Sequence, residues 1–164
     1  MRTSLKFFVA GIPKAQPRAR ATARGGFARV YDPGTADDWK MIVRSEARKA
    51  WVATGDVTPF SGPTCVNLTF YFPRPKNHFK SQSAIARTAS APPILKANAP
   101  NWHTSKPDKD NSEKAVLDAL VNLGLLADDK QVCDGRTQKL YEIINKPGWT
   151  TGCLIEILPL EIQI

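Results

Sequence analysis

Long apolar segments and patterned cysteines are both missing from this sequence. No run of about 18 or more apolar residues occurs, and the short apolar stretch near the N-terminus is too brief for a signal peptide, so a membrane-spanning or secreted protein is not expected. The three cysteines, Cys65, Cys133 and Cys153, are odd in number and widely spaced, without a C-x-x-C pair. This pattern indicates neither a disulfide framework nor a zinc knuckle, and we expect a protein of a reducing cytoplasm.

Acidic residues are absent from two long parts of the chain. None occurs in residues 1–31 or 57–107, which carry seven and six Lys or Arg residues. The whole chain has a formal charge of +8, which indicates a polyanionic partner or an anionic surface. Seven of the 15 acids lie instead in residues 108–134. A basic protein that concentrates its acids in this way has a reason to hold carboxylates together.

The pattern of apolar residues predicts one small α+β domain. A length of 164 residues with 42% hydrophobic content suits a single domain over residues 1–164. Strands are predicted at 5–10, 65–72, 136–144 and 153–160, and amphipathic helices at 35–53 and 111–123. Thr35 is a candidate N-cap of the first helix, and Asp110 or Asn111 of the second. The order of these elements suits a mixed β-sheet with two main helices.

Two basic segments interrupt this pattern. Residues 13–34 are expected to form a cationic loop or loose hairpin in which Phe27 and Tyr31 stand among arginines, a combination that suits a nucleic-acid backbone and its bases. A solvated loop is the alternative on this segment alone. Residues 74–106 lack periodicity and are rich in Ser, Ala, Pro and Lys, and we expect a flexible basic flap there.

The acidic segment begins with two aspartates that can face one site. Pro107 disfavours a helix at Lys106, so Asp108 and Asp110 are expected in an extended stretch just before the second helix. Alternate residues of an extended chain point the same way. Both carboxylates can therefore serve one ligand.

A third carboxylate can join them if the chain reverses. Lys114 and Asp118 lie four residues apart and share a helix face, with Lys114 nearer the first two aspartates. An extended stretch of six residues spans about 20 Å, which matches the length of the helix before it. We therefore expect residues 124–129 to double back and bring Asp128 or Asp129 beside the first two aspartates.

Converging carboxylates repel one another unless a cation lies among them. Oxygen ligands suit Mg²⁺ or Mn²⁺, and no His or Cys pattern here suits zinc. Such an ion can polarise a phosphodiester, activate water and stabilise the leaving 3′ oxygen, while Lys114 stabilises developing charge. The alternative is structural: Asp108 and Asp110 only cap and charge a helix, and Asp128 and Asp129 only form a polar turn.

At these residues the chain resembles the RusA family of Holliday junction resolvases, which are common in phages and prophages. The family core P-D-x-D-N-x-x-K-x-x-x-D-A-L appears as PDKDNSEKAVLDAL at residues 107–120, and D-D-x-Q-V as DDKQV at 128–132. The stretch GIPKAQPR at 11–18 is similar to phage-type members. The similarity is strong over 106–132 and extends in layout over 5–158.

The resemblance implies a RusA-like, homodimeric fold that binds branched DNA and makes paired, symmetric nicks with Mg²⁺ or Mn²⁺ in the cytoplasm of a bacterial host. It places the essential metal-binding and catalytic aspartates on Asp108, Asp110 and Asp129, with Asp128 as a weaker neighbour. The functional lysine falls on Lys114.

Two features depart from compact family members. The long basic segment 74–106 leaves the substrate preference open, and Lys109 adds a positive charge beside the metal site where an apolar residue is frequent.

We expect a metal-dependent endodeoxyribonuclease that resolves four-way junctions in DNA recombination and repair. The alternatives are a DNA-binding accessory protein with a vestigial metal site and a nuclease without junction preference. The cationic residues that we expect to contact DNA are Lys14, Arg18, Arg20, Arg24, Arg29, Lys76, Lys80 and Lys106.

Overall fold

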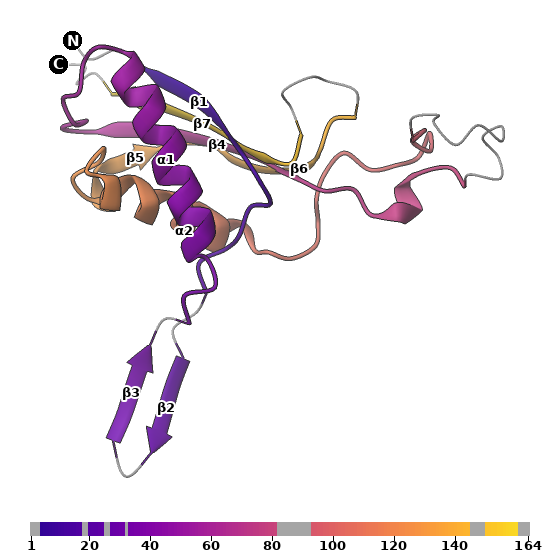
Figure 1. The fold of residues 1–164 in the computed structure, drawn as a ribbon, viewed down its shortest axis with the longest axis horizontal. Helices are drawn as coiled ribbons and strands as arrows, with labels where there is room; N and C mark the ends of the chain where they lie inside the picture. Colours follow the sequence, from indigo (N-terminus) through magenta and orange to yellow (C-terminus); the bar gives the residue numbers. More distant parts are fainter. Residues whose placement is uncertain are drawn as a thin grey trace.

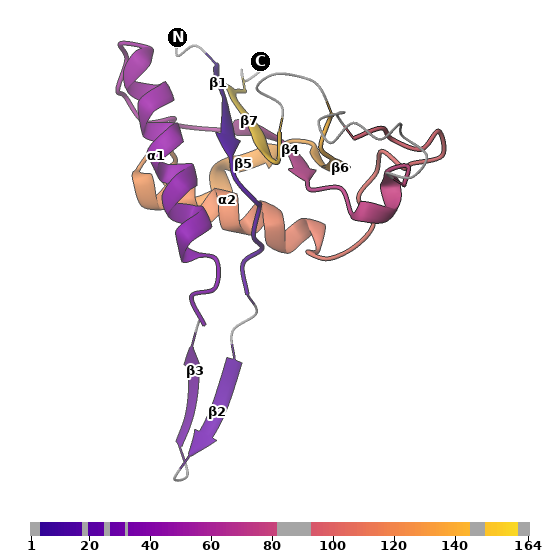
Figure 2. The same cartoon turned by 45° about the vertical axis from the view of Figure 1, so that its right-hand side comes forward.

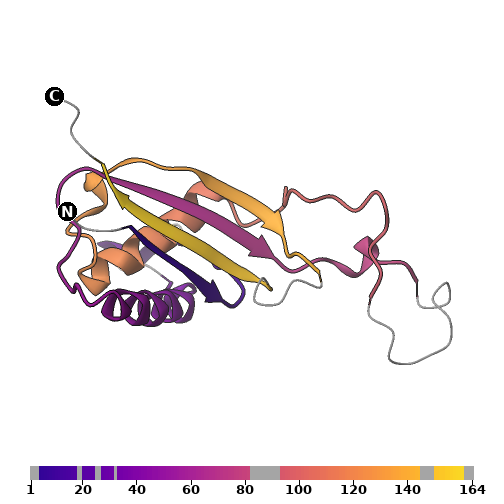
Figure 3. The same cartoon turned by 90° about the horizontal axis from the view of Figure 1, so that it is seen from above.

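A five-stranded sheet with two helices on one face forms the centre of the computed structural model (Figures 1 and 3). The structure describes residues 4–17, 20–24, 27–31, 33–81, 93–144 and 150–160, with the backbone alone for 20–24 and 27–31. The strands are β1 (Leu5–Ala10), β2 (Arg20–Arg24), β3 (Phe27–Tyr31), β4 (Thr64–Phe72), β5 (Val132–Asp134), β6 (Thr137–Tyr141) and β7 (Gly152–Pro159). The helices are α1 (Asp37–Ala53) and α2 (Lys109–Leu123), with short 3₁₀ turns η1 (Lys76–His78) and η3 (Asp129–Gln131).

The sheet is mixed, as the sequence predicts. The antiparallel pairs β1·β7 and β7·β4 build one half of it. On the other side of β4, both β5 and β6 pair with it in parallel, one after the other along its length. The small α+β domain with a mixed sheet and two helices is therefore confirmed.

One face of the sheet carries the core. Alternate β4 residues, from Val66 through Leu68 and Phe70 to Phe72, are buried against the helices, as the two-residue period of a strand requires. On α1, Trp39, Val43 and Ala47 recur at helical spacing and are at most 1% exposed. Among the described residues, no helix is long and apolar enough to cross a membrane.

Both helices begin at residues other than those predicted. The N-cap position of α1 is Ala36 rather than Thr35, and no side chain caps that helix end. Helix α2 starts at Lys109, two residues earlier than predicted, so Asp110 lies in its first turn and not in the extended stretch. The buried Ser112 hydroxyl and its N–H both donate to Asp108 O, which extends the helical hydrogen bonding back to that residue.

Two extensions leave the core in different directions (Figures 1 and 2). The first is the β2·β3 hairpin, paired from Arg20 opposite Tyr31 to Arg24 opposite Phe27, so the basic N-terminal segment forms a hairpin. The second, which we call the arm, comprises residues 74–106, of which 74–81 and 93–106 are described. Within the arm, Phe79 pairs with Leu95. Its flexibility stays a prediction.

Candidate functional site

The first turn of α2 carries the first two predicted aspartates. Asp108 occupies the N-cap position with an extended backbone, and Asp110 lies one turn before Lys114. Both aspartates are exposed. They lie at the end of the helix where free N–H groups and the helix dipole favour negative charge.

Both basic extensions are anchored at this turn. The Gln16 N–H, at the base of the hairpin, donates to Asn111 O at 2.8 Å. On the arm side, the Lys139 ammonium of β6 donates to Ser105 O at 2.7 Å and to Pro107 O. Burial lowers the pKa of Lys139, and the Asp108 carboxylate opposes that shift. The hairpin and the arm therefore meet where Asp108 and Asp110 lie.

The chain doubles back after α2, as predicted. Gly124 takes a left-handed conformation (φ 79°) that ends the helix. Leu125 and Leu126 are then fully buried, and the Phe60 N–H donates to Leu125 O at 2.9 Å. This reversal brings the Asp129 carboxylate within 3.7 Å of the Lys114 ammonium.

Positively and negatively charged side chains alternate from the core to the surface around Asp129. Lys40 of α1 donates to Asp118 Oδ2 at 3.4 Å, and Asp118 Oδ1 lies 3.5 Å from Lys114 Nζ. Lys114 in turn faces Asp129. Sequence reasoning gave Lys40 no role, although its spacing from Val43 and Ala47 places it on the buried stripe of α1.

Gln131 fixes the turn that carries Asp129. Its side-chain oxygen accepts from the N–H groups of Ala127 (2.8 Å) and Asp128 (3.4 Å). Its amide nitrogen lies within hydrogen-bond distance of Phe60 O (3.1 Å), Gly62 O (3.4 Å) and Thr64 Oγ1 (3.1 Å). The side chain thus ties η3 to the loop before β4, which gives the Gln of the D-D-x-Q-V motif a physical role.

Asp128 caps η3 instead of facing Lys114. Its carboxylate accepts from the Lys130 N–H at 3.0 Å and pairs with the Lys130 ammonium at 3.2 Å. Both interactions lower the pKa of Asp128, and the hydrogen bond from the backbone N–H of Lys130 has the larger effect.

The predicted convergence of all the aspartates stays a prediction. The part of the chain that the structure describes contains no group of three or more His, Cys, Asp or Glu side chains that could hold a metal ion. The exposed carboxylates of Asp108, Asp110 and Asp129 offer oxygen ligands, which are the ligands that Mg²⁺ and Mn²⁺ prefer.

The described residues that we expect to contact DNA lie on the two extensions or next to them. Lys14 forms an ion pair with Asp38, whose pKa is lowered by the Lys14 hydrogen bond and by the Trp39 N–H. Arg18 lies outside the described residues. On the arm and just before α2, the exposed Lys76, Lys80 and Lys106 have no carboxylate partner within the described ranges.

The hairpin register places its three arginines on one face. Arg20 is opposite Tyr31, Arg24 is opposite Phe27, and Arg29 is opposite Thr22. Directly opposed residues of an antiparallel pair share a face, and alternate residues along a strand return to it. These six positions therefore share one face of the hairpin.

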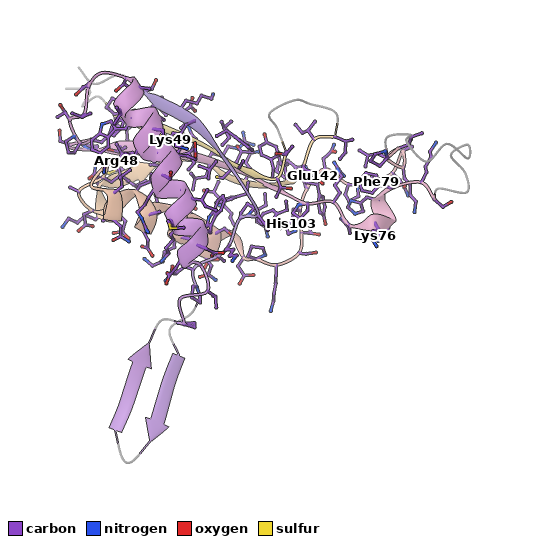
Figure 4. The ribbon with its side chains drawn as sticks, in the orientation of Figure 1. Arg48, Lys49, Lys76, Phe79, His103 and Glu142 are labelled. Atoms are coloured by element: carbon purple, nitrogen blue, oxygen red, sulfur yellow. The ribbon has the colours of Figure 1, made fainter. Side chains whose placement is uncertain are left out.

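Aromatic and histidine side chains hold the base of the arm (Figure 4). The His103 ring stacks on Phe72 at 4.2 Å between centroids, and both His103 and His78 contact the Tyr141 ring. Burial, followed by the nearby Lys139 charge, lowers the pKa of His103. Arg74 donates to Glu142 O at 3.0 Å and to Pro100 O at 2.7 Å. Sequence spacing did not reveal this cluster, because its members are far apart in the chain.

Comparison with known proteins agrees with the motif. The family model described as Endodeoxyribonuclease RusA matches residues 10–148. The chain is also 33% identical over 140 residues to the "Uncharacterized protein YqaN" of Bacillus subtilis (strain 168), which covers 84% of this chain and 87% of that protein. The family match spans most of the sequence and includes α1, α2 and the turn at Asp129. This chain therefore belongs to the RusA endodeoxyribonuclease family.

Proposed function

We propose that this protein is a divalent-metal-dependent endodeoxyribonuclease that resolves four-way DNA junctions by paired, symmetric nicks in recombination and repair. The observation that carries the proposal is the meeting of both basic extensions at the first turn of α2. The Gln16 N–H joins the hairpin to Asn111, and Lys139 holds the chain that enters the helix. DNA bound along these extensions would pass Asp108 and Asp110. RusA-type nucleases are generally divalent-metal dependent.

The residues that would hold the ion are Asp108, Asp110 and Asp129, with Asp128 as a weaker neighbour. When bound, Mg²⁺ or Mn²⁺ supplies a Lewis acid for the phosphoryl oxygen and a more acidic water. The side chain of Lys114 is 55% exposed, and its ammonium lies between Asp118 and Asp129. It can therefore donate to a phosphate oxygen and stabilise the charge that develops there.

Binding of the DNA backbone falls to the cationic residues of the two extensions. On the hairpin, Arg20, Arg24 and Arg29 share a face with Phe27 and Tyr31, so phosphate contacts and base stacking would come from the same side. On the arm, the exposed Lys80 and Lys76, of which Figure 4 labels Lys76, would add phosphate contacts from a second direction.

Paired nicks require two active sites related by two-fold symmetry. A homodimer with an isologous interface supplies them with one gene product, and we include this state in the proposal. We also include in the proposal a location in the cytoplasm of a bacterial host, as a phage- or prophage-type resolvase.

Cleavage of a labelled four-way junction tests this function. We expect paired nicks with Mg²⁺ and with Mn²⁺, no nicks with chelator, and little cutting of a linear duplex of the same sequence. Binding without cutting under all three conditions would favour the accessory protein with a vestigial site. Equal cutting of the duplex would indicate a nuclease without junction preference.

A further inference from the structure

We propose that Lys40 is a positioning residue for Lys114: by neutralising Asp118 from inside the core, it leaves the Lys114 ammonium available to Asp129 and to a substrate phosphate. The role of Lys114 towards a phosphate rests on the proposed nuclease function. The effect of Lys40 on the surroundings of Lys114 is a property of the free protein and can be tested without DNA.

Lys40 is a buried charge that needs a partner. The residue is 7% exposed, and it sits on α1 where that helix packs on α2. Burying an ammonium group is costly unless it is paired. Within the described ranges, Asp118 Oδ2, at 3.4 Å, is the carboxylate oxygen paired with Lys40. The Lys40 ammonium therefore stays paired with the Asp118 carboxylate.

Exposure increases from Lys40 through Asp118 to Lys114. The side chains of Lys40, Asp118 and Lys114 are 9%, 25% and 55% exposed, and that of Asp129 is 51% exposed. Lys114 lies 3.5 Å from Asp118 and 3.7 Å from Asp129, distances typical of loose, solvent-screened pairs. Lys114 can exchange partners at low cost, whereas the interior Lys40 cannot.

Removing the Lys40 charge would change this balance. Asp118 would keep its negative charge with Lys114 as its remaining partner. Lys114 would then be drawn towards Asp118, four residues along the same helix, and away from Asp129. Lys114 would then be less available to Asp129 and to a substrate phosphate.

The test is the position of Lys114 Nζ in crystal structures of the protein and its variants, without metal or DNA. In Lys40→Met we expect Lys114 Nζ to move towards Asp118 and to lose its contact with Asp129, which is 3.7 Å away in the wild type. In Lys40→Met/Asp118→Asn both charges are gone, so Lys114 should return to its place beside Asp129. Lys49→Met, on the exposed side of α1, is the control and should leave Lys114 in place.

Each outcome decides the inference. An unchanged position of Lys114 in folded Lys40→Met overturns it, and so does failure of the double variant to restore the wild-type position, because a packing defect would persist there. If Lys40→Met does not fold, Lys40→Gln replaces it in both variants. Junction cleavage is a separate readout: we expect a lower kcat with KM unchanged. A wild type that cuts no junction refutes the proposed function, while the position of Lys114 in the variants still tests the role of Lys40.

Discussion

Replacing Asp108 or Asp129 by Asn should abolish junction cleavage while leaving junction binding intact. Asn has the shape of Asp but lacks the charge that a hard divalent ion requires. Loss of a residue that only orients a metal ligand typically costs about 10–100-fold in metal affinity or activity, so loss of a ligand itself should cost at least about 100-fold. Both positions are exposed, and Asn is a good N-cap at position 108, so the fold should be retained.

Single-turnover cleavage and gel-shift binding of the same junction check this result. Asp134→Asn is the matched control, because Asp134 is an exposed acid on β5 only five residues beyond Asp129. It should cut at the wild-type rate. Full activity in either Asp108→Asn or Asp129→Asn would refute the assignment of that carboxylate.

Gln131→Met is expected to lower both stability and cleavage. The substitution keeps the length of the side chain but removes its contacts to the loop before β4 and to the turn that carries Asp129. Leaving those backbone groups unpaired should cost about 1–3 kcal/mol in the free energy of unfolding. Because Asp129 would no longer be held in place, cleavage should fall by about 10–100-fold, the range seen when a residue that orients a metal ligand is lost.

Urea unfolding and cleavage under conditions where the variant is fully folded separate the two effects. Gln138→Met, on the half-buried strand β6, is the control and should change neither quantity much. If Gln131→Met loses stability but cleaves at the wild-type rate when folded, Gln131 supports the fold and does not position Asp129.

Local patterns in the sequence predict most of the fold. The alternation of Val66, Leu68, Phe70 and Phe72 locates β4 and its buried face. Helix boundaries are less predictable because they depend on particular hydrogen bonds. The helical bond from the Ser112 N–H to Asp108 O, an oxygen that the Ser112 hydroxyl also contacts, starts α2 at Lys109 and carries Asp110 into the helix.

Contacts between distant segments cannot be read from local patterns. Lysine is usually exposed, so the burial of Lys40 depends on Asp118, which is far away in the sequence. The bonds from Gln131 to Phe60 and Thr64 depend on the packing of η3 against the loop before β4. The D-D-x-Q-V motif singles out Gln131 in the sequence, and the structure shows which groups its side chain contacts.

Isothermal titration calorimetry of Mn²⁺ into the free protein tests the metal site most directly. We predict saturable binding to the wild type and loss of that binding in both Asp108→Asn and Asp129→Asn. No binding above background in the wild type, or equal binding in the two variants, would contradict a metal centre built on these carboxylates.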